Sequence, residues 1–111
     1  MPTARLVEVR AKQGTEAEVA RIMRELGDWL STQKGFLGNL GLVAVEVEDS
    51  PDIVGIIFWE TREDGNRAAM TARALALMSE LKMVAGEEHI RSEYYTVTEQ
   101  GAGLLRAAEK G

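Results

Sequence analysis

The segment IVGIIFWE, residues 53–60, is the feature that most constrains the fold, because its apolar residues fall on both faces of the strand that they predict. One face carries Ile53, Gly55, Ile57 and Trp59, and the other carries Val54, Ile56 and Phe58. Successive side chains of a strand point to opposite faces, so a strand of this kind needs cover on both sides. The chain therefore has to place this strand inside a layered structure with two separate covers.

Length and composition limit the domain organisation, the chemistry and the partners that we expect. The 111 residues suffice for one domain with a single core, which we expect over residues 1–98, with 99–111 as a C-terminal tail or a short docking helix. The chain has no cysteine and one histidine, His89, so we expect no disulfide and no metal. A net charge of −5 with scattered Lys and Arg argues against nucleic acid. Neither a leader pattern nor a run of eighteen apolar residues is present, so we expect no membrane span and a cytoplasmic location.

Hydrophobic periodicity predicts six elements. Strands are expected over residues 5–12, 36–48, 53–60 and 89–98, with a polar turn at 49–52. One helix is expected from Thr15 to the Lys34-Gly35 stop and another from Thr61 to about Val84. The first helix has one apolar stripe, made of Val19, Ile22, Met23, Leu26, Trp29 and Leu30. The order is β-α-β-β-α-β, which is the split, ferredoxin-like α+β pattern with an antiparallel sheet.

Residues at the helix ends support these limits. Thr15 and Glu18 have the spacing of a capping box, and Thr61 is followed by Asp64 at the third helical position. Gly86 ends the second helix. The helices then cover one face of the sheet, and a second copy of the chain is expected to cover the other, so we predict a homodimer.

Two short motifs are similar to those of a known family. Lys34-Gly35-Phe36-Leu37-Gly38 resembles the P-G-F-L-G of the antibiotic-biosynthesis-monooxygenase family, and Phe58-Trp59-Glu60-Thr61 resembles its strand-ending x-W-E-S. The resemblance spans roughly residues 4 to 98. It implies a dimeric α/β barrel with a small-molecule cavity between helices and sheet.

The family's activities are compared with this sequence one residue at a time. The resemblance implies a cofactor-independent monooxygenase, an oxidoreductase acting on a small planar apolar molecule of the aromatic or quinol type. The family's asparagine four residues before the tryptophan and its tyrosine six residues after it are Gly55 and Gly65 here. The haem-degrading branch is disfavoured, because no tryptophan follows Trp59 and His89 lies beyond the second helix. The alternatives are a non-catalytic small-molecule-binding or stress-related dimer, and an accessory domain that only recruits a partner.

Trp59 and Gly55 each allow two interpretations. Trp59 is either a core residue at a corner between helix and sheet or a wall of the cavity, since an indole combines a large apolar face with one N–H. Gly55 leaves space above its strand, and either the alanine-rich second helix or a planar ligand fills that space.

Tyr94 and His89 are the candidate catalytic residues. Tyr94 can orient or protonate a carbonyl if it faces the cavity, and otherwise it is a structural tyrosine. His89 is a residue type that suits a general base, although a solvated position beside Glu87 and Glu88 explains it equally. These three adjacent residues make a poor metal site, because neighbours in a strand point to opposite sides.

The remaining ligand-binding candidates are Asn39, Met70 and Arg73. Asn39 is either a polar group on the pocket face of its strand or a bulge residue, because asparagine tolerates positive φ. Met70 suits an apolar lining or an ordinary core. Arg73 balances an anionic ligand if it turns inward, and it is solvated if it does not.

Overall fold

One antiparallel sheet organises the protein, and the computed structural model describes it over residues 2–44 and 53–100. Its strands lie in the order β2-β3-β1-β4. They are β1 (Thr3–Val9), β2 (Phe36–Val43), β3 (Ile53–Trp59) and β4 (Ile90–Thr96). The predicted turn at 49–52 and most of the predicted tail, residues 101–111, lie outside the described residues.

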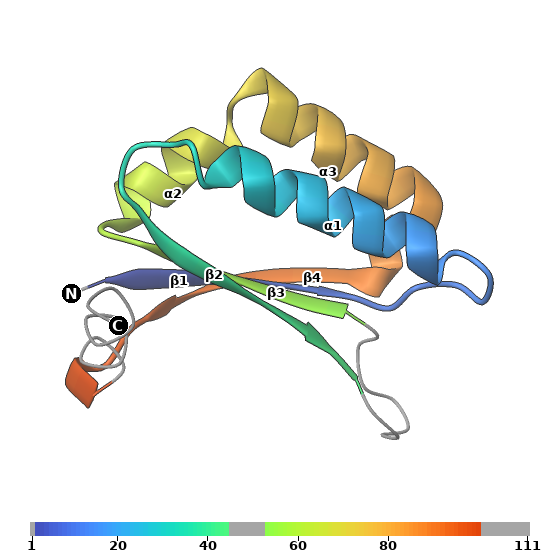
Figure 1. Cartoon of the computed structure of the whole chain (residues 1–111), viewed down its shortest axis with the longest axis horizontal. Helices are drawn as coiled ribbons and strands as arrows, with labels where there is room; N and C mark the ends of the chain where they lie inside the picture. The colour runs from blue at the N-terminus through green and yellow to red at the C-terminus, as the bar shows by residue number, and fades with distance from the viewer. Residues whose placement is uncertain (1, 45–52, 101–111) are drawn as a thin grey trace.

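The helices lie together on one face of this sheet (Figure 1). They are α1 (Glu16–Leu30), α2 (Arg62–Ala69) and α3 (Ala72–Ala85), followed by the short 3₁₀ helix η1 (Glu87–His89). The predicted α+β, ferredoxin-like class with an antiparallel sheet is confirmed. No helix in the described part of the chain is long and apolar enough to cross a membrane.

The core fills the space between the helices and the sheet. Val7 and Val9 of β1 are fully buried there, as their alternation predicts. Most of the predicted stripe of α1 is buried against them, and α3 adds its own apolar side: Val19, Ile22, Leu26, Leu30, Ala74, Leu77 and Leu81. An amphipathic helix stabilises such a fold by removing its apolar stripe from water.

The second predicted helix is two helices in the structure. The chain leaves the helical conformation at Thr71, where φ is −69° and ψ is 150°. The Thr71 hydroxyl donates to the carbonyl of Ala68 at 2.7 Å and accepts the indole N–H of Trp29 at 2.9 Å. Threonine competes for backbone hydrogen bonds in this way, and Trp29 of α1 holds the break in place.

The cap predicted at Thr15 is wrong. Its hydroxyl donates to the carbonyl of Lys12 at 2.7 Å and makes no capping hydrogen bond, while Glu18 forms an ion pair with Arg21. The helix begins nonetheless at Glu16, because its apolar stripe packs on the sheet. The predicted cap at Thr61 is confirmed, since the Thr61 oxygen accepts the backbone N–H of Asp64 at 3.1 Å.

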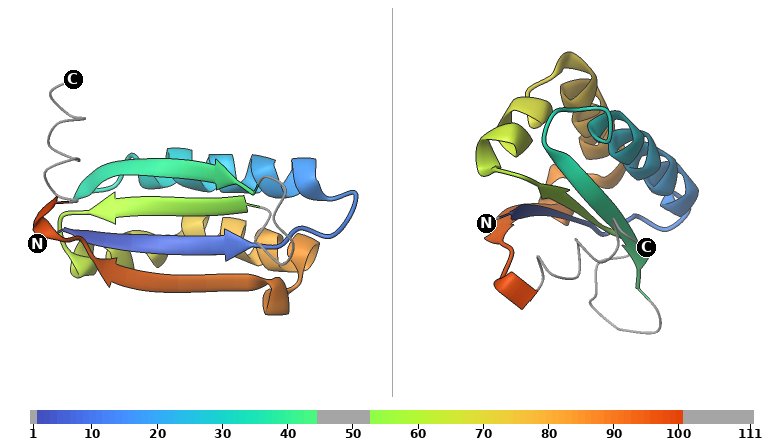
Figure 2. Two further views of the ribbon diagram at one scale, coloured as in Figure 1. Left: turned by 90° about the horizontal axis from the view of Figure 1, so that it is seen from below. Right: turned by 60° about the vertical axis from the view of Figure 1, so that its left-hand side comes forward.

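The face of the sheet away from the helices is apolar along β2 and β3, whereas its β1–β4 half carries the ion pairs of Arg91 with Glu8 and Glu93. Figure 2 shows this face uncovered by the helices. Leu40 and Leu42 of β2 are 53% and 50% exposed, and the half-buried Val54, Ile56 and Phe58 of β3 lie beside them. Ala4 and Val97 form a small buried cluster with Ile56 and Phe58 on this face, and no helix of the described residues covers the rest of it.

Candidate functional site

A groove of about 390 Å³ lies between α1 and the β2–β3 side of the sheet. Its walls are mainly apolar, and they include Met23, Leu26, Gly27, Asn39, Gly41 and Gly55. β2, which supplies part of the lining, is an edge strand of the sheet and passes beneath α1 (Figure 1). Concave apolar spaces with a few polar groups are where small molecules bind.

Two glycines on neighbouring strands form the floor of this groove. Gly41 of β2 lies directly opposite Gly55 of β3 in the antiparallel register. A Cβ built on Gly55 would lie 2.9 Å from the Cε of Met23, which shows that Gly55 faces α1. A Cβ built on Gly41 would meet nothing within 4 Å. Met23 therefore covers one glycine of the floor, while the space above the other is open.

Of the two interpretations of Gly55, packing by the second helix is wrong, and a planar ligand stays a prediction. The side chain that occupies the space above Gly55 comes from α1, not from the alanine-rich second helix. Methionine is flexible and polarisable, so its methyl group can leave such a position at small cost.

Asn39 of β2 supplies an amide to the groove lining, and its side chain is exposed. Its Nδ2 lies 2.8 Å from the position that a Cβ on Gly27 would take, so Gly27 lacks a side chain where Asn39 approaches. The other polar side chains of the lining belong to Arg24 and Asp28, which are exposed on α1. The groove thus joins an apolar interior to one amide and two charged groups.

Trp59 lies outside this lining, at the corner where β3 meets α2. It is 1% exposed, and its ring packs edge-on against Phe36 at a centroid distance of 5.9 Å. A Cβ on Gly65 would lie 3.0 Å from the Trp59 Cδ1, so Gly65 admits the indole under α2. The indole Nε1 has no hydrogen-bond partner among the described residues. This placement fits the corner interpretation of Trp59.

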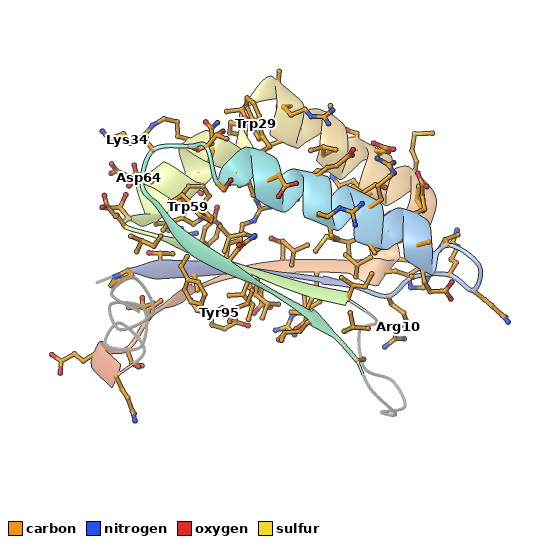
Figure 3. The ribbon with its side chains drawn as sticks, viewed as in Figure 1. Arg10, Trp29, Lys34, Trp59, Asp64 and Tyr95 are labelled. Carbon is orange, nitrogen blue, oxygen red and sulfur yellow. The ribbon has the colours of Figure 1, made fainter. Side chains whose placement is uncertain are left out.

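Asp64 completes the same corner, as Figure 3 shows beside Trp59 and Lys34. It is 6% exposed, receives hydrogen bonds from the Thr61 hydroxyl and the Arg67 guanidinium, and packs where Gly35 has no side chain. The Thr61 hydrogen bond holds the pKa of Asp64 below its ordinary value of 3.8, against the opposing effect of burial, and Arg67 adds to the lowering. The carboxylate is therefore charged at neutral pH and stabilises the start of α2.

The two candidate catalytic residues lie away from the groove and from each other. The Tyr94 ring, on the helix side of β4, is contacted by the guanidinium groups of Arg5 and Arg62. His89 lines a separate polar pocket of about 210 Å³ beside Arg10, which Figure 3 labels. Neither residue is part of the groove lining.

Two of the remaining candidate residues line the groove, and two lie outside its lining. Asn39 and Gly55 lie together in the groove. Met70 is 69% exposed at the end of α2, and Arg73 is exposed on α3 with its guanidinium 4.0 Å from Glu25. Within residues 2–44 and 53–100, no group of three His, Cys, Asp or Glu side chains is placed to hold a metal ion.

Sequence reasoning missed Gly41 and Gly27 as parts of the site. The spacing Gly38-Asn39-Leu40-Gly41 is a signal in hindsight, because two glycines in one strand weaken it without a packing reason. Which of them faces α1 depends on strand register, which no local pattern in the sequence provides.

Known structures share this architecture. No protein-family model and no curated protein matches the chain. SnoaB, a cofactor-independent oxygenase from Streptomyces nogalater, has a TM-score of 0.67 at 17% identity, covering 88% of this chain and 92% of that one. A putative antibiotic biosynthesis monooxygenase from Nitrosomonas europaea has 0.71 at 17% identity, covering 85% and 88%. A dimeric ferredoxin-like protein of unknown function from Jannaschia sp. CCS1 has 0.76 at 12% identity, covering 87% and 100%.

These identities are low, so the likeness concerns the fold. The resemblance first seen in the two short motifs is matched by structures of the same name over most of the chain. The chain has the ferredoxin-like fold that these antibiotic-biosynthesis-monooxygenase structures share.

Proposed function

We propose that the protein binds a small planar apolar molecule in the groove between α1 and the sheet and oxidises it with molecular oxygen, without a cofactor. The observation that carries this proposal is the paired-glycine floor, in which Met23 lies above Gly55 and the space above Gly41 is open. A floor without side chains is flat, and a flat floor under an apolar helix suits an aromatic ring better than a branched aliphatic molecule.

The proposed reaction needs few catalytic groups from the protein. An aromatic molecule with an acidic C–H or O–H supplies the electrons itself once it is deprotonated. One oxygen atom enters the product and the other leaves as water. The protein then has to bind the molecule, exclude water and stabilise the anion as it forms.

Asn39 is our proposed source of that stabilisation. An amide N–H donor beside an apolar ring site favours a developing oxyanion, because the hydrogen bond to a charged oxygen is stronger than that to the neutral form. Tyr94 and His89 lie outside the groove lining, so the proposal gives them no part in this step. Arg24 and Asp28 at the groove are the titratable groups nearest to a bound molecule.

A non-catalytic binding protein is the second candidate, and one observation favours it. Among the residues that line the groove, Arg24 and Asp28 are the only titratable ones, and both are exposed on α1. A general base shielded from water is therefore missing from this lining. A protein that only stores or carries the molecule needs no such base.

We further propose that the protein works as a homodimer in the cytoplasm. The open face of the sheet presents Leu40, Leu42 and Ile56, and a second copy of the same face would remove them from water. The structure from Jannaschia sp. CCS1, described as dimeric, supports the proposal by its fold.

Anthrone is a suitable first probe, because it is planar, enolises readily and is converted by one molecule of oxygen to anthraquinone and water. Binding is measured by isothermal titration calorimetry without oxygen, and turnover is measured by ¹⁸O incorporation. We expect the wild-type protein to bind anthrone and Gly41→Val, which fills the floor, to bind it at least ten-fold more weakly. Ser79→Ala, an exposed change on α3, is the control and should bind normally.

The outcomes separate the two candidates. Binding with ¹⁸O incorporation above the uncatalysed rate supports the oxygenase. Binding that Gly41→Val weakens, without incorporation, supports the binding protein. Equal binding by wild type and Gly41→Val would place the ligand elsewhere and end both proposals.

A further inference from the structure

Two arginines gather around one aromatic ring on the helix side of the sheet, toward its β4 edge and away from the groove at β2 and β3. The guanidinium carbon of Arg5 lies 5.9 Å from the centre of the Tyr94 ring, and that of Arg62 lies 5.0 Å from it. They come from different elements, since Arg5 is on β1 directly opposite Tyr94 on β4, and Arg62 is the first residue of α2. The fold therefore brings both cations to one place.

The position of Arg5 is unusual for a charged residue. It lies on the helix side of an inner strand, opposite the buried Ile57 on one neighbour and Tyr94 on the other. It is half-buried, and its Nε donates to the Ser92 hydroxyl at 3.0 Å. A guanidinium has five N–H donors, and a partly buried charge is stabilised when the others are also satisfied.

Neither arginine has a counter-ion in the described part of the chain. Arg21, Arg67 and Arg91 each contact a carboxylate. No Asp or Glu among the described residues lies within ion-pair distance of Arg5 or Arg62, and cation–π contact with Tyr94 leaves both charges in place.

The two positive charges also lie close to each other. Since both guanidinium carbons are near one ring, they are separated by no more than about 11 Å, which is comparable with the screening length of about 8 Å at physiological ionic strength. An oxyanion that lies between them would be within one screening length of both charges. The Tyr94 hydroxyl, for which the described residues provide no hydrogen-bond partner, is a third donor at this place.

We propose that Arg5, Arg62 and Tyr94 form a binding site for an oxyanion, a phosphate or carboxylate group, separate from the apolar groove. Guanidinium groups match the oxygen geometry of both anions, and two of them favour a phosphate dianion over a single carboxylate. The site is independent of the proposed oxygenase function and stands if that function fails.

The test follows the arginine Nε–H signals in ¹H–¹⁵N spectra while sodium phosphate is added at pH 7 and constant ionic strength, with sodium chloride as the reference salt. We expect signals of the wild-type protein to shift and saturate. Arg62→Gln changes an exposed residue and should weaken phosphate binding about ten-fold or more, since hydrogen bonds to charged groups contribute about 1.5–3 kcal/mol. Arg5→Gln should do the same, and Tyr94→Phe should have a smaller effect.

Lys82→Gln is the matched control, because it removes one positive charge from the exposed side of α3 and should leave phosphate binding unchanged. A parallel titration with sodium acetate distinguishes the two anions, and the tighter of them names the ligand class. Shifts no larger than those in chloride, or equal affinity of wild type and Arg62→Gln, would overturn the proposal.

Discussion

Adding one methyl group at Gly41 should stabilise the protein. Gly41 lies inside β2, its φ is outside the left-handed region, and a Cβ there meets nothing within 4 Å. Alanine then fits without strain and lowers the conformational entropy of the unfolded chain, which stabilises proteins by about 0.4–1 kcal/mol at such positions. The gain corresponds to a rise in melting temperature of a few degrees, roughly 4 °C per kcal/mol for a domain of this size.

Gly55→Ala is the matched comparison, because the same entropy gain is opposed by a contact. Its methyl group would lie 2.9 Å from the Cε of Met23, which has to move toward the groove. We therefore expect Gly55→Ala to be less stable than Gly41→Ala, close to the wild type. Urea denaturation at neutral pH measures both free energies of unfolding, provided that the m-values agree.

The reasoning would be refuted by either of two results. A loss of stability in Gly41→Ala would mean that the floor of the groove is not open at this position. A larger gain in Gly55→Ala than in Gly41→Ala would mean that Met23 does not cover Gly55.

Three further predictions concern the corner and the open face. Thr61→Ala should lower the free energy of unfolding by about 1 kcal/mol because it removes a helix cap, whereas Thr15→Ala, which removes no cap, should change it much less in the same urea assay. Because the pKa of folded Asp64 is lowered, its contribution is complete above the ordinary value of 3.8 and is lost as the pH falls below that value. Asp64→Asn should therefore reduce the loss of unfolding free energy as the pH falls below 3.8, and an unchanged loss would contradict this. Ile56→Asp should turn the proposed dimer into a folded monomer by sedimentation velocity, and a monomeric wild type would end that proposal.

The order of elements could be predicted because it depends on local patterns. The alternation around Val7 and Val9 and the apolar stripe of α1 each occupy one element, and burial follows them closely. The Thr61 cap is equally local, since the hydroxyl and the N–H that it accepts are three residues apart. Patterns that lie within one element can be recognised without knowledge of the rest of the chain.

The helix break at Thr71 could not be predicted in the same way. The run of alanines around it favours helix on both sides, and the hydrogen bond that fixes the break comes from Trp29, 42 residues earlier. Met70 for this reason lies exposed at the end of α2, although the spacing of an unbroken helix places it on the buried arc with Leu77 and Leu81. A contact between distant elements has overridden local propensity.

The groove depends on a β-bulge in β2, between Phe36 and Gly38. The pairing of β2 with β3 shifts by one residue between Phe36, opposite Trp59, and Gly38, opposite Phe58. A one-residue shift exchanges the two faces of a strand.

This shift decides which residues of β2 face the groove. With the bulge, Phe36 packs on Trp59 in the corner, and Asn39 and Gly41 beyond the bulge face α1. Without it, the same alternation that directs Phe36 inward would direct Leu40 inward and turn both Asn39 and Gly41 to the open face. A single extra residue thus lets one strand combine an aromatic corner with an amide and a glycine floor. A variant that lost the bulge would therefore turn Asn39 and Gly41 away from α1.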